Sequence, residues 1–70
     1  MSQPWIPKKG QKFFDPDNNM TLVFDEANFG GQYPPYLHFE AFDEEGNEYD
    51  TELAWWEFED EIETGGLLPI

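Results

Sequence analysis

The side chains through which this chain could do chemistry are its carboxylates. The 70 residues include sixteen Asp or Glu and three Lys, and the formal net charge is −13 at pH 7. Twelve of the sixteen acids lie between Glu40 and Glu63, and no Lys or Arg follows Lys12. A surface that is only soluble intersperses cations among its acids. An acidic surface repels nucleic acid and anionic lipid, so we expect it to bind cations or basic proteins.

Catalysis fits the composition poorly. The chain has one histidine, one serine and no cysteine, which leaves few pairs of nucleophile and base. His38 lies between Leu37 and Phe39 in an expected strand, where a partly exposed sheet residue is the simpler interpretation. Paired carboxylates need a pocket that separates their pKa values, and we expect little room for one of about 300 Å³ or more. We therefore predict a protein that is not an enzyme and needs no cofactor.

A calcium site is suggested only in part by the segment "DPDNNMTLVFDE". Asp15, Asp17, Asn19 and Glu26 match the ligand spacing of a helix–loop–helix calcium loop. Such a loop needs glycine where this chain has Met20, and the residues that follow are typical of a strand. A turn followed by a strand is the expectation, with no dedicated metal site.

The elements that must position the acids are expected to be short strands followed by one helix. Phe13 and Phe14 begin a first strand, "DPDNN" forms a hairpin loop and residues 20–26 form a second strand. Residues 36–53 read as a hairpin around the turn "DEEGN". Leu37, Phe39 and Ala41 are predicted to face inward, and Tyr49, Thr51 and Leu53 share one face. Glu48, Asp50 and Glu52 then lie on the opposite face.

The segment "EFEDEIE" at residues 57–63 has a period that fits either a strand or a helix. Read as a helix, Trp55, Phe58 and Ile62 share one face, and Thr51 could cap its start. Gly65 or Gly66 provides a left-handed stop, followed by Leu67 and Leu68 as the apolar contact and Pro69 as a terminator. The stop signals favour a helix.

These elements predict a single acidic domain, residues 1–70, of the α+β class. We expect a small antiparallel sheet of three or four strands with a C-terminal helix, and an all-β small barrel is the alternative. Seven Phe, three Trp and three Tyr argue for a packed core rather than disorder. A domain of this size without cysteine buries a thin core, so a homodimer is a further expectation. The sequence shows neither a signal peptide nor a membrane span, which indicates a cytoplasmic protein.

The acids of "EFEDEIE" repel one another if the segment is helical. Glu57 and Glu61, and likewise Glu59 and Glu63, are four residues apart, and each such pair costs about 0.2–0.5 kcal/mol. Alternate strand residues stand about 6.5–7 Å apart and helical residues four apart rise about 6 Å. Two acidic ridges, one on the hairpin and one on the helix, could therefore imitate the phosphates of a DNA duplex.

This profile, densest in "DEEGNEYDTE" and "EFEDEIE", resembles the acidic DNA-mimic proteins of bacteriophages, among them inhibitors of the nucleoid protein HU. The resemblance implies an inhibitor that occupies the basic DNA-binding surface of an HU-like dimer in the host cytoplasm and displaces DNA. It implies no direct contact with nucleic acid or membrane. The acids that would stand in for phosphates are Asp43, Glu44, Glu45, Glu48, Asp50, Glu52, Glu57, Glu59, Asp60, Glu61 and Glu63. Trp55, Trp56 and Phe58 would anchor the helix, or part of this aromatic surface would form a homodimer contact.

Two alternatives stay open. Other DNA-binding hosts fit the same profile, including restriction enzymes, RNA polymerase, repair glycosylases and nucleases. The chain could instead be a non-catalytic structural or interaction module that binds through Trp5, Trp55 and Trp56.

Overall fold

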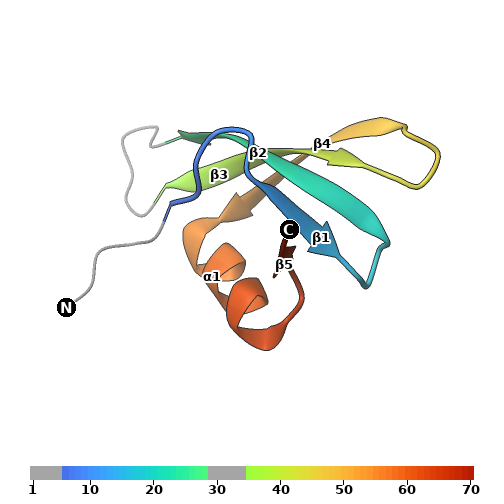
Figure 1. Cartoon of the computed structure of the whole chain (residues 1–70). Helices are drawn as coiled ribbons and strands as arrows, with labels where there is room; N and C mark the ends of the chain where they lie inside the picture. The colour runs from blue at the N-terminus through green and yellow to red at the C-terminus, as the bar shows by residue number, and fades with distance from the viewer. Residues whose placement is uncertain (1–5, 29–34) are drawn as a thin grey trace.

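The computed structural model describes residues 6–28 and 35–70, which form a five-stranded antiparallel sheet with one helix on one of its faces (Figure 1). The strands are β1 (Lys12–Asp15), β2 (Met20–Asn28), β3 (Tyr36–Phe42), β4 (Glu48–Ala54) and β5 (Leu68–Pro69), and the helix is α1 (Trp55–Thr64). The strand order is β4-β3-β2-β1-β5. The predicted α+β fold is confirmed, and the all-β alternative is wrong because residues 55–64 are helical.

Strands β3 and β4 form the predicted hairpin. Their register pairs Glu40 with Asp50 and Phe39 with Thr51. Leu37, Phe39 and Ala41 are buried, as the alternation predicts. Successive strand residues point to opposite faces, so the residues between them face away from the core. The hairpin thus separates an apolar inner face from a polar outer face.

Helix α1 begins later than the sequence predicts. Thr51, the expected cap, lies within β4, and the extended backbone continues to Ala54. The carboxylate of Glu57 accepts a hydrogen bond from the Ala54 amide at 3.1 Å, so the helix supplies its own acceptor at its start. Gly65 ends the helix with a φ of 84°, the left-handed stop that was expected.

Strand β5 is the element that the sequence did not predict. Leu68 and Pro69 pair with Phe14 and Phe13 of β1, and the amide of Ile70 donates to the carbonyl of Lys12 at 3.2 Å. The sheet therefore has one strand more than the largest number expected. Leu67 is buried, as predicted for the contact after the helix, whereas Leu68 is exposed at the sheet edge.

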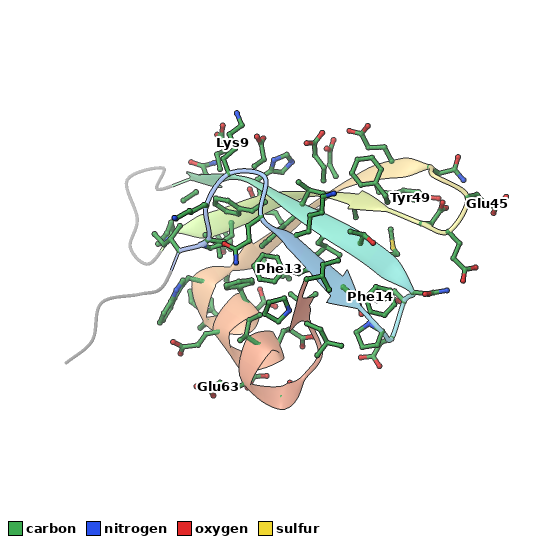
Figure 2. All side chains as sticks on the ribbon, viewed as in Figure 1. Lys9, Phe13, Phe14, Glu45, Tyr49 and Glu63 are labelled. Atoms are coloured by element: carbon green, nitrogen blue, oxygen red, sulfur yellow. The ribbon has the colours of Figure 1, made fainter. Side chains whose placement is uncertain are left out.

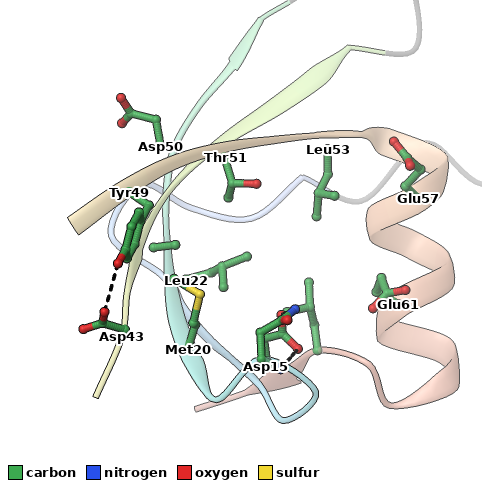
Figure 3. A pocket seen from close by; sticks show the side chains of 13 residues that line it. Asp15, Met20, Leu22, Asp43, Tyr49, Asp50, Thr51, Leu53, Glu57 and Glu61 are labelled. Atoms are coloured by element: carbon green, nitrogen blue, oxygen red, sulfur yellow. Dashed lines mark hydrogen bonds between the residues drawn. The ribbon is translucent and has the colours of Figure 1, made fainter. Parts of the chain in front are cut away.

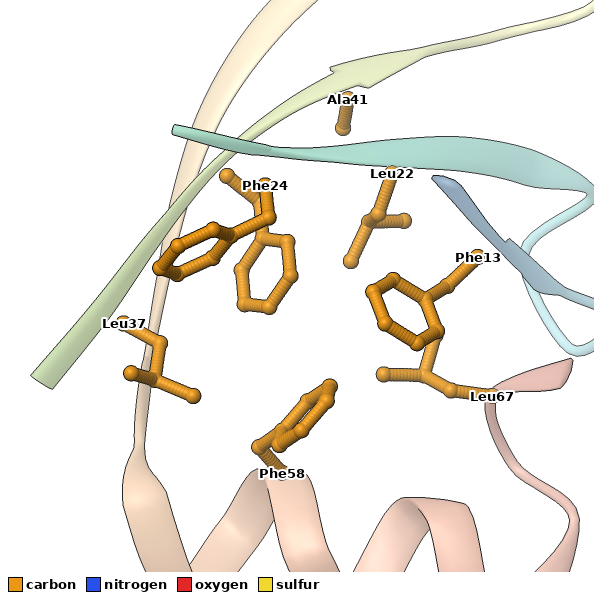
Figure 4. Packing of buried hydrophobic residues seen from close by; sticks show 8 residues of the cluster. Phe13, Leu22, Phe24, Leu37, Ala41, Phe58 and Leu67 are labelled. Carbon is orange, nitrogen blue, oxygen red and sulfur yellow. The ribbon is translucent and has the colours of Figure 1, made fainter. Parts of the chain in front are cut away.

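Aromatic rings form the centre of the core, between the sheet and α1 (Figure 4). Phe13, Phe39 and Phe58 are fully buried. The ring of Phe58 meets that of Phe13 edge to face, with centroids 5.3 Å apart, and lies 5.6 Å from that of Phe39. Such pairs contribute about 0.5–1.5 kcal/mol each beyond the area they bury. Phe58 therefore fixes α1 against the sheet, and with it the direction in which the helical acids project.

Candidate functional site

The acids of β4 project from the face of the sheet that α1 does not cover. Glu48, Asp50 and Glu52 are all exposed. Tyr49, Thr51 and Leu53 between them face the helix side, because Leu53 packs against the core and the others line a cavity beside α1. The structure brings these three predicted acids onto one face, as their alternation predicts.

Strands β2 and β3 add acids to this face that were absent from the predicted site. The register places Glu40 opposite Asp50, and His38 between Glu52 and Glu26. We define the outer acid surface as Asp25, Glu26, Glu40, Glu48, Asp50 and Glu52. The alternation of residues 36–42 was a signal for Glu40, since it shares a face with His38. Asp25 lies at an irregularity in the β2–β3 register between Phe24 and Glu26, which no local pattern announces.

Like charges approach one another closely on the outer acid surface. A hydrogen bond between the carboxyl groups of Glu40 and Glu48, together with their repulsion, raises the pKa of Glu40. His38 Nδ1 lies 3.1 Å from Asp25 Oδ2, and its Nε2 lies 3.6 Å from Asp50 Oδ1. The hydrogen bond to Asp25 raises the pKa of His38 above 6.5, although desolvation opposes it. The surface therefore attracts protons, as it would attract other cations.

The acids of α1 form a second surface on the other layer of the molecule. We define the helix acids as Glu57, Glu59, Asp60, Glu61 and Glu63; Glu61 is half-buried and the others are exposed. The last turn of α1 holds no basic residue. Within residues 6–28 and 35–70, the lysine ion pair joins Lys9 Nζ to Asp25 Oδ1 at 3.7 Å and does not reach the helix. The helix acids thus lack a neutralising cation in the described part of the chain.

The sheet lies between these two surfaces. Figure 2 shows Glu45 at the tip of the β3–β4 hairpin, far from Glu63 on α1. The predicted acids therefore do not form one continuous patch. The outer acid surface and the helix acids face different directions, and the hairpin turn lies at one end of the sheet.

Asp43 shapes the hairpin turn as well as carrying charge. Its carboxylate accepts hydrogen bonds from the amides of Glu45 and Asn47, both at 2.9 Å, and from the Tyr49 hydroxyl at 3.1 Å. The side-chain bond from Asn47 is the main reason that the pKa of Asp43 is lowered. Glu44 accepts a hydrogen bond from the side chain of Asn19, which ties this turn to the β1–β2 turn.

The aromatic residues predicted as anchors differ in exposure. Trp55 packs against the core and Phe58 is fully buried, so both hold the helix in place. Trp56 is 54% exposed, and its ring centroid lies 6.4 Å from that of Tyr36, which is 37% exposed. Trp5 lies outside the described residues. Among the described residues, Trp56 and Tyr36 therefore form an exposed aromatic pair that a partner can reach.

A cavity of about 550 Å³ lies between α1, β4 and the two hairpin turns (Figure 3). The expectation that so small a domain offers little room for a pocket of about 300 Å³ or more was wrong. The twisted sheet extends past the short helix, so that Tyr49 near the hairpin turn is exposed on the inner face (Figure 1). The lining residues are Asp15, Asn18, Met20, Leu22, Ala41, Asp43, Tyr49, Asp50, Thr51, Leu53, Glu57, Glu61 and Leu67. Sequence reasoning missed this site because its walls come from both hairpins and the helix.

The segment that resembled a calcium loop is a hairpin turn. The Asp15 carboxylate accepts hydrogen bonds from the amide of Asp17 at 3.1 Å and the side-chain amide of Asn18 at 2.8 Å. Strand β2 begins at Met20, where the calcium loop would require glycine. No group of three or more His, Cys, Asp or Glu in residues 6–28 and 35–70 is arranged to hold a metal ion.

In comparisons with known proteins, no protein-family model, curated protein or solved structure matches this chain. In the part of the chain that the structure describes, no helix is long and apolar enough to cross a membrane.

Proposed function

We propose that this protein is a DNA-mimic inhibitor, which binds the basic DNA-binding surface of a DNA-binding protein in the bacterial host cytoplasm and displaces DNA. An HU-like dimer is the favoured partner. One observation carries the proposal: the outer acid surface and the helix acids are largely solvent-exposed, yet lysine reaches them only at Asp25 among the described residues. A partner that supplies cations relieves this self-repulsion.

Proteins that grip DNA neutralise phosphates with Lys and Arg and release condensed counterions. Dense carboxylates present the same kind of target to those cations. Glu48, Asp50 and Glu52 repeat about every 6.5–7 Å along β4, and Glu57 and Glu61 rise about 6 Å along α1. The acids thus form rows with a regular spacing.

A competition experiment tests the proposal. A fluorescent DNA duplex is bound to purified HU, this protein is added, and anisotropy reports the release of DNA. We predict release at about 50 mM salt and much weaker release at about 200 mM, because screening weakens contacts between the acids and the partner's cations. If a saturating amount leaves HU fully bound to DNA at low salt, HU is not the partner.

Two variants with equal loss of charge identify the surface that acts. One variant carries Glu40→Gln, Glu48→Gln, Asp50→Asn and Glu52→Gln; the other carries Glu57→Gln, Glu59→Gln, Asp60→Asn and Glu61→Gln. We predict that at least one loses about tenfold or more in displacement. Each variant serves as the control for the other, since both change the net charge by the same amount. If both variants displace DNA as well as the unaltered chain does, from HU and from the other DNA-binding proteins of a bacterial lysate, DNA mimicry is contradicted.

The exposed pair of Trp56 and Tyr36 favours a second candidate function, an interaction module that binds a partner or a second copy of the chain through aromatic contacts. In that case Trp56→Ala weakens binding by about tenfold or more and salt changes it little. The same titrations at two salt concentrations therefore distinguish the two functions.

A further inference from the structure

We propose that the cavity beside α1 is the docking site for a segment of the partner in which Lys or Arg flanks an aliphatic side chain. This inference rests on the proposed function, because it supplies the short-range contact of a partner that acidic surfaces attract from a distance. Charge complementarity raises the rate of encounter and the specificity, whereas side chains buried in a pocket contribute most of the affinity.

The floor of the cavity is apolar. Met20 and Leu22 of β2, Ala41 of β3 and Leu53 of β4 line it from the inner face of the sheet, and Leu22 and Ala41 belong to the buried core. Met20 and Leu53 are only half-buried. A pocket that combines an apolar lining with a few polar groups has the usual form of a binding site. An aliphatic side chain of the partner is therefore the group that complements this floor.

The rim of the cavity is acidic on opposite sides. Glu57 and Glu61, one helical turn apart, extend from α1, while Asp15 and Asp43 lie at the two hairpin turns (Figure 3). Asp50 belongs to the lining through its backbone, since Figure 3 shows its side chain pointing away from the cavity. Carboxylates on both sides of an apolar floor complement a segment that carries cations on either side of an aliphatic residue.

The side of the cavity opposite α1, formed by Asp15, Asp43 and Tyr49, is held in place by hydrogen bonds within the chain. Hydrogen bonds to neighbouring amides fix the carboxylates of Asp15 and Asp43, and the Asn19 side chain joins one turn to Glu44 of the other. The Tyr49 hydroxyl donates a hydrogen bond to the carboxylate of Asp43, and this bond fixes the orientation of the Tyr49 ring at the edge of the cavity (Figure 3). A guanidinium or ammonium group is attracted to the face of such a ring. A preformed wall lowers the entropic cost of docking.

The size and charge of the cavity select among occupants. At about 550 Å³ it exceeds the volume of one side chain and falls within the range of ligand sites. The acidic rim repels anionic ligands. A neutral apolar ligand would fill the floor but would leave the carboxylates of the rim without cations. Lys and Arg complement both the apolar floor and the acidic rim, because their aliphatic stems cover apolar surface while their charged ends reach the carboxylates.

The probe for this site is a short synthetic peptide in which Lys and Leu alternate, and a Lys–Ser peptide of equal length and charge is its control. Backbone amide NMR shifts of the full chain are recorded during each titration at low salt. We expect the Lys–Leu peptide to shift Leu22, Tyr49, Leu53 and Glu61, and to bind about tenfold more tightly than the Lys–Ser peptide. Equal affinity of the two peptides, or shifts confined to the outer acid surface, would overturn the proposal.

Two matched variants provide the second measurement. Thr51→Phe fills the cavity from β4, whereas Thr21→Phe makes the same change in β2 on the opposite face of the sheet. We expect Thr51→Phe to weaken Lys–Leu binding by about tenfold and Thr21→Phe to change it by less than about twofold. Circular dichroism checks that both variants fold. If one variant does not fold, the NMR shift changes of the unaltered chain decide whether the peptide binds in the cavity. Unaltered binding by a folded Thr51→Phe overturns the docking site.

The outcomes separate this proposal from the proposed function. If the unaltered chain binds the Lys–Leu peptide in the cavity but displaces no DNA from any partner, DNA mimicry fails and the docking site stands. If Thr51→Phe displaces DNA from HU as well as the unaltered chain does, the docking site fails and charge mimicry stands. Selective binding of spermidine or of a second copy of this chain, with no binding of the Lys–Leu peptide, also overturns the proposal.

Discussion

The carboxylates of this chain fall into two groups according to what they contact. Asp15 and Asp43 accept several backbone and side-chain hydrogen bonds and shape the hairpin turns. Glu48 and Asp50, in contrast, lie on an exposed strand face beside other acids. The first group stabilises the fold. The second adds repulsion that the described lysines barely offset, and we assign this group to the DNA-mimic surface, whereas Asp15 and Asp43 also border the cavity proposed as a docking site.

At the level of single residues, His38 gives a direct test of the outer acid surface. We predict that Asp25→Asn lowers the pKa of His38 and that Asp50→Asn lowers it less, because the hydrogen bond to Asp25 is the largest cause of the raised value. A proton NMR titration measures this pKa directly, since His38 is the chain's one histidine. An equal decrease in both variants would contradict this ranking.

The same residue makes stability depend on pH. Because the pKa of folded His38 lies above 6.5, its contribution is fully present below 6.5 and is lost as pH rises through the raised value. Urea unfolding should therefore give a lower free energy of unfolding at about pH 8 than at about pH 6. The decrease should be smaller in His38→Gln, which serves as the control.

At the level of elements, the junction between β4 and α1 positions two acidic surfaces with very few residues. Strand β4 runs directly into the helix at Ala54, with no loop between them. The amide of Trp55 donates to the carbonyl of Pro35 at 3.1 Å, which fixes the first helical turn against the start of β3. A direct chain connection and a backbone hydrogen bond therefore set the position of the helix acids relative to the outer acid surface.

The end of α1 depends on a single glycine. Gly65 has a φ of 84°, and a Cβ there would meet no atom within 4 Å, so a side chain would be strained by its backbone alone. We predict that Gly65→Ala lowers the free energy of unfolding by about 1–2 kcal/mol in urea titrations. Gly65→Asn should cost less, because Asn tolerates left-handed backbone. Equal losses for Ala and Asn would show that the conformation is not the cause.

At the level of the whole molecule, the net charge of −13 affects folding and binding in opposite ways. Salt shortens the Debye length from about 30 Å at 0.01 M to about 8 Å at 0.15 M. Screening reduces repulsion within the folded chain and also weakens its attraction to a basic partner. Stability and affinity should therefore respond to salt with opposite signs.

We predict that the melting temperature rises with sodium chloride over this range. A gain of about 1 kcal/mol corresponds to about 4–8 °C for a domain of this size. Thermal unfolding followed by circular dichroism measures the rise. The variant neutralised at Glu40, Glu48, Asp50 and Glu52 should show a smaller rise, and a flat profile for the unaltered chain would contradict the prediction.

Local patterns predicted much of the fold. The alternation in residues 36–53 identified the β3–β4 hairpin and its buried face, because a period of two is imposed by strand geometry. The stop at Gly65 separated helix from strand for "EFEDEIE". Thr51 was misassigned as a cap because tertiary pairing with Phe39 extends β4 beyond the point where local signals favour a helix.

The candidate site was predicted only in part. The acids of β4 and α1 were identified from their clustering and spacing along the chain, whereas strand register joins Glu40 and Asp25 to the outer acid surface. The cavity could not be predicted, since its lining residues come from four strands, the helix and the segments that connect them. Register and layer packing are properties of distant segments, and a one-dimensional pattern does not encode them locally.

By itself, the sequence determined the acidic excess, the absence of cations after Lys12, the hairpin faces and the helix stop, because these depend on residue type and on neighbours a few positions away. Only the tertiary structure decided that β5 completes the sheet, that the two acidic surfaces lie on different layers, and that a cavity with an apolar floor opens beside α1. Each of these depends on Phe13, Phe39 and Phe58 meeting in one core, since that packing sets which part of the sheet the helix covers.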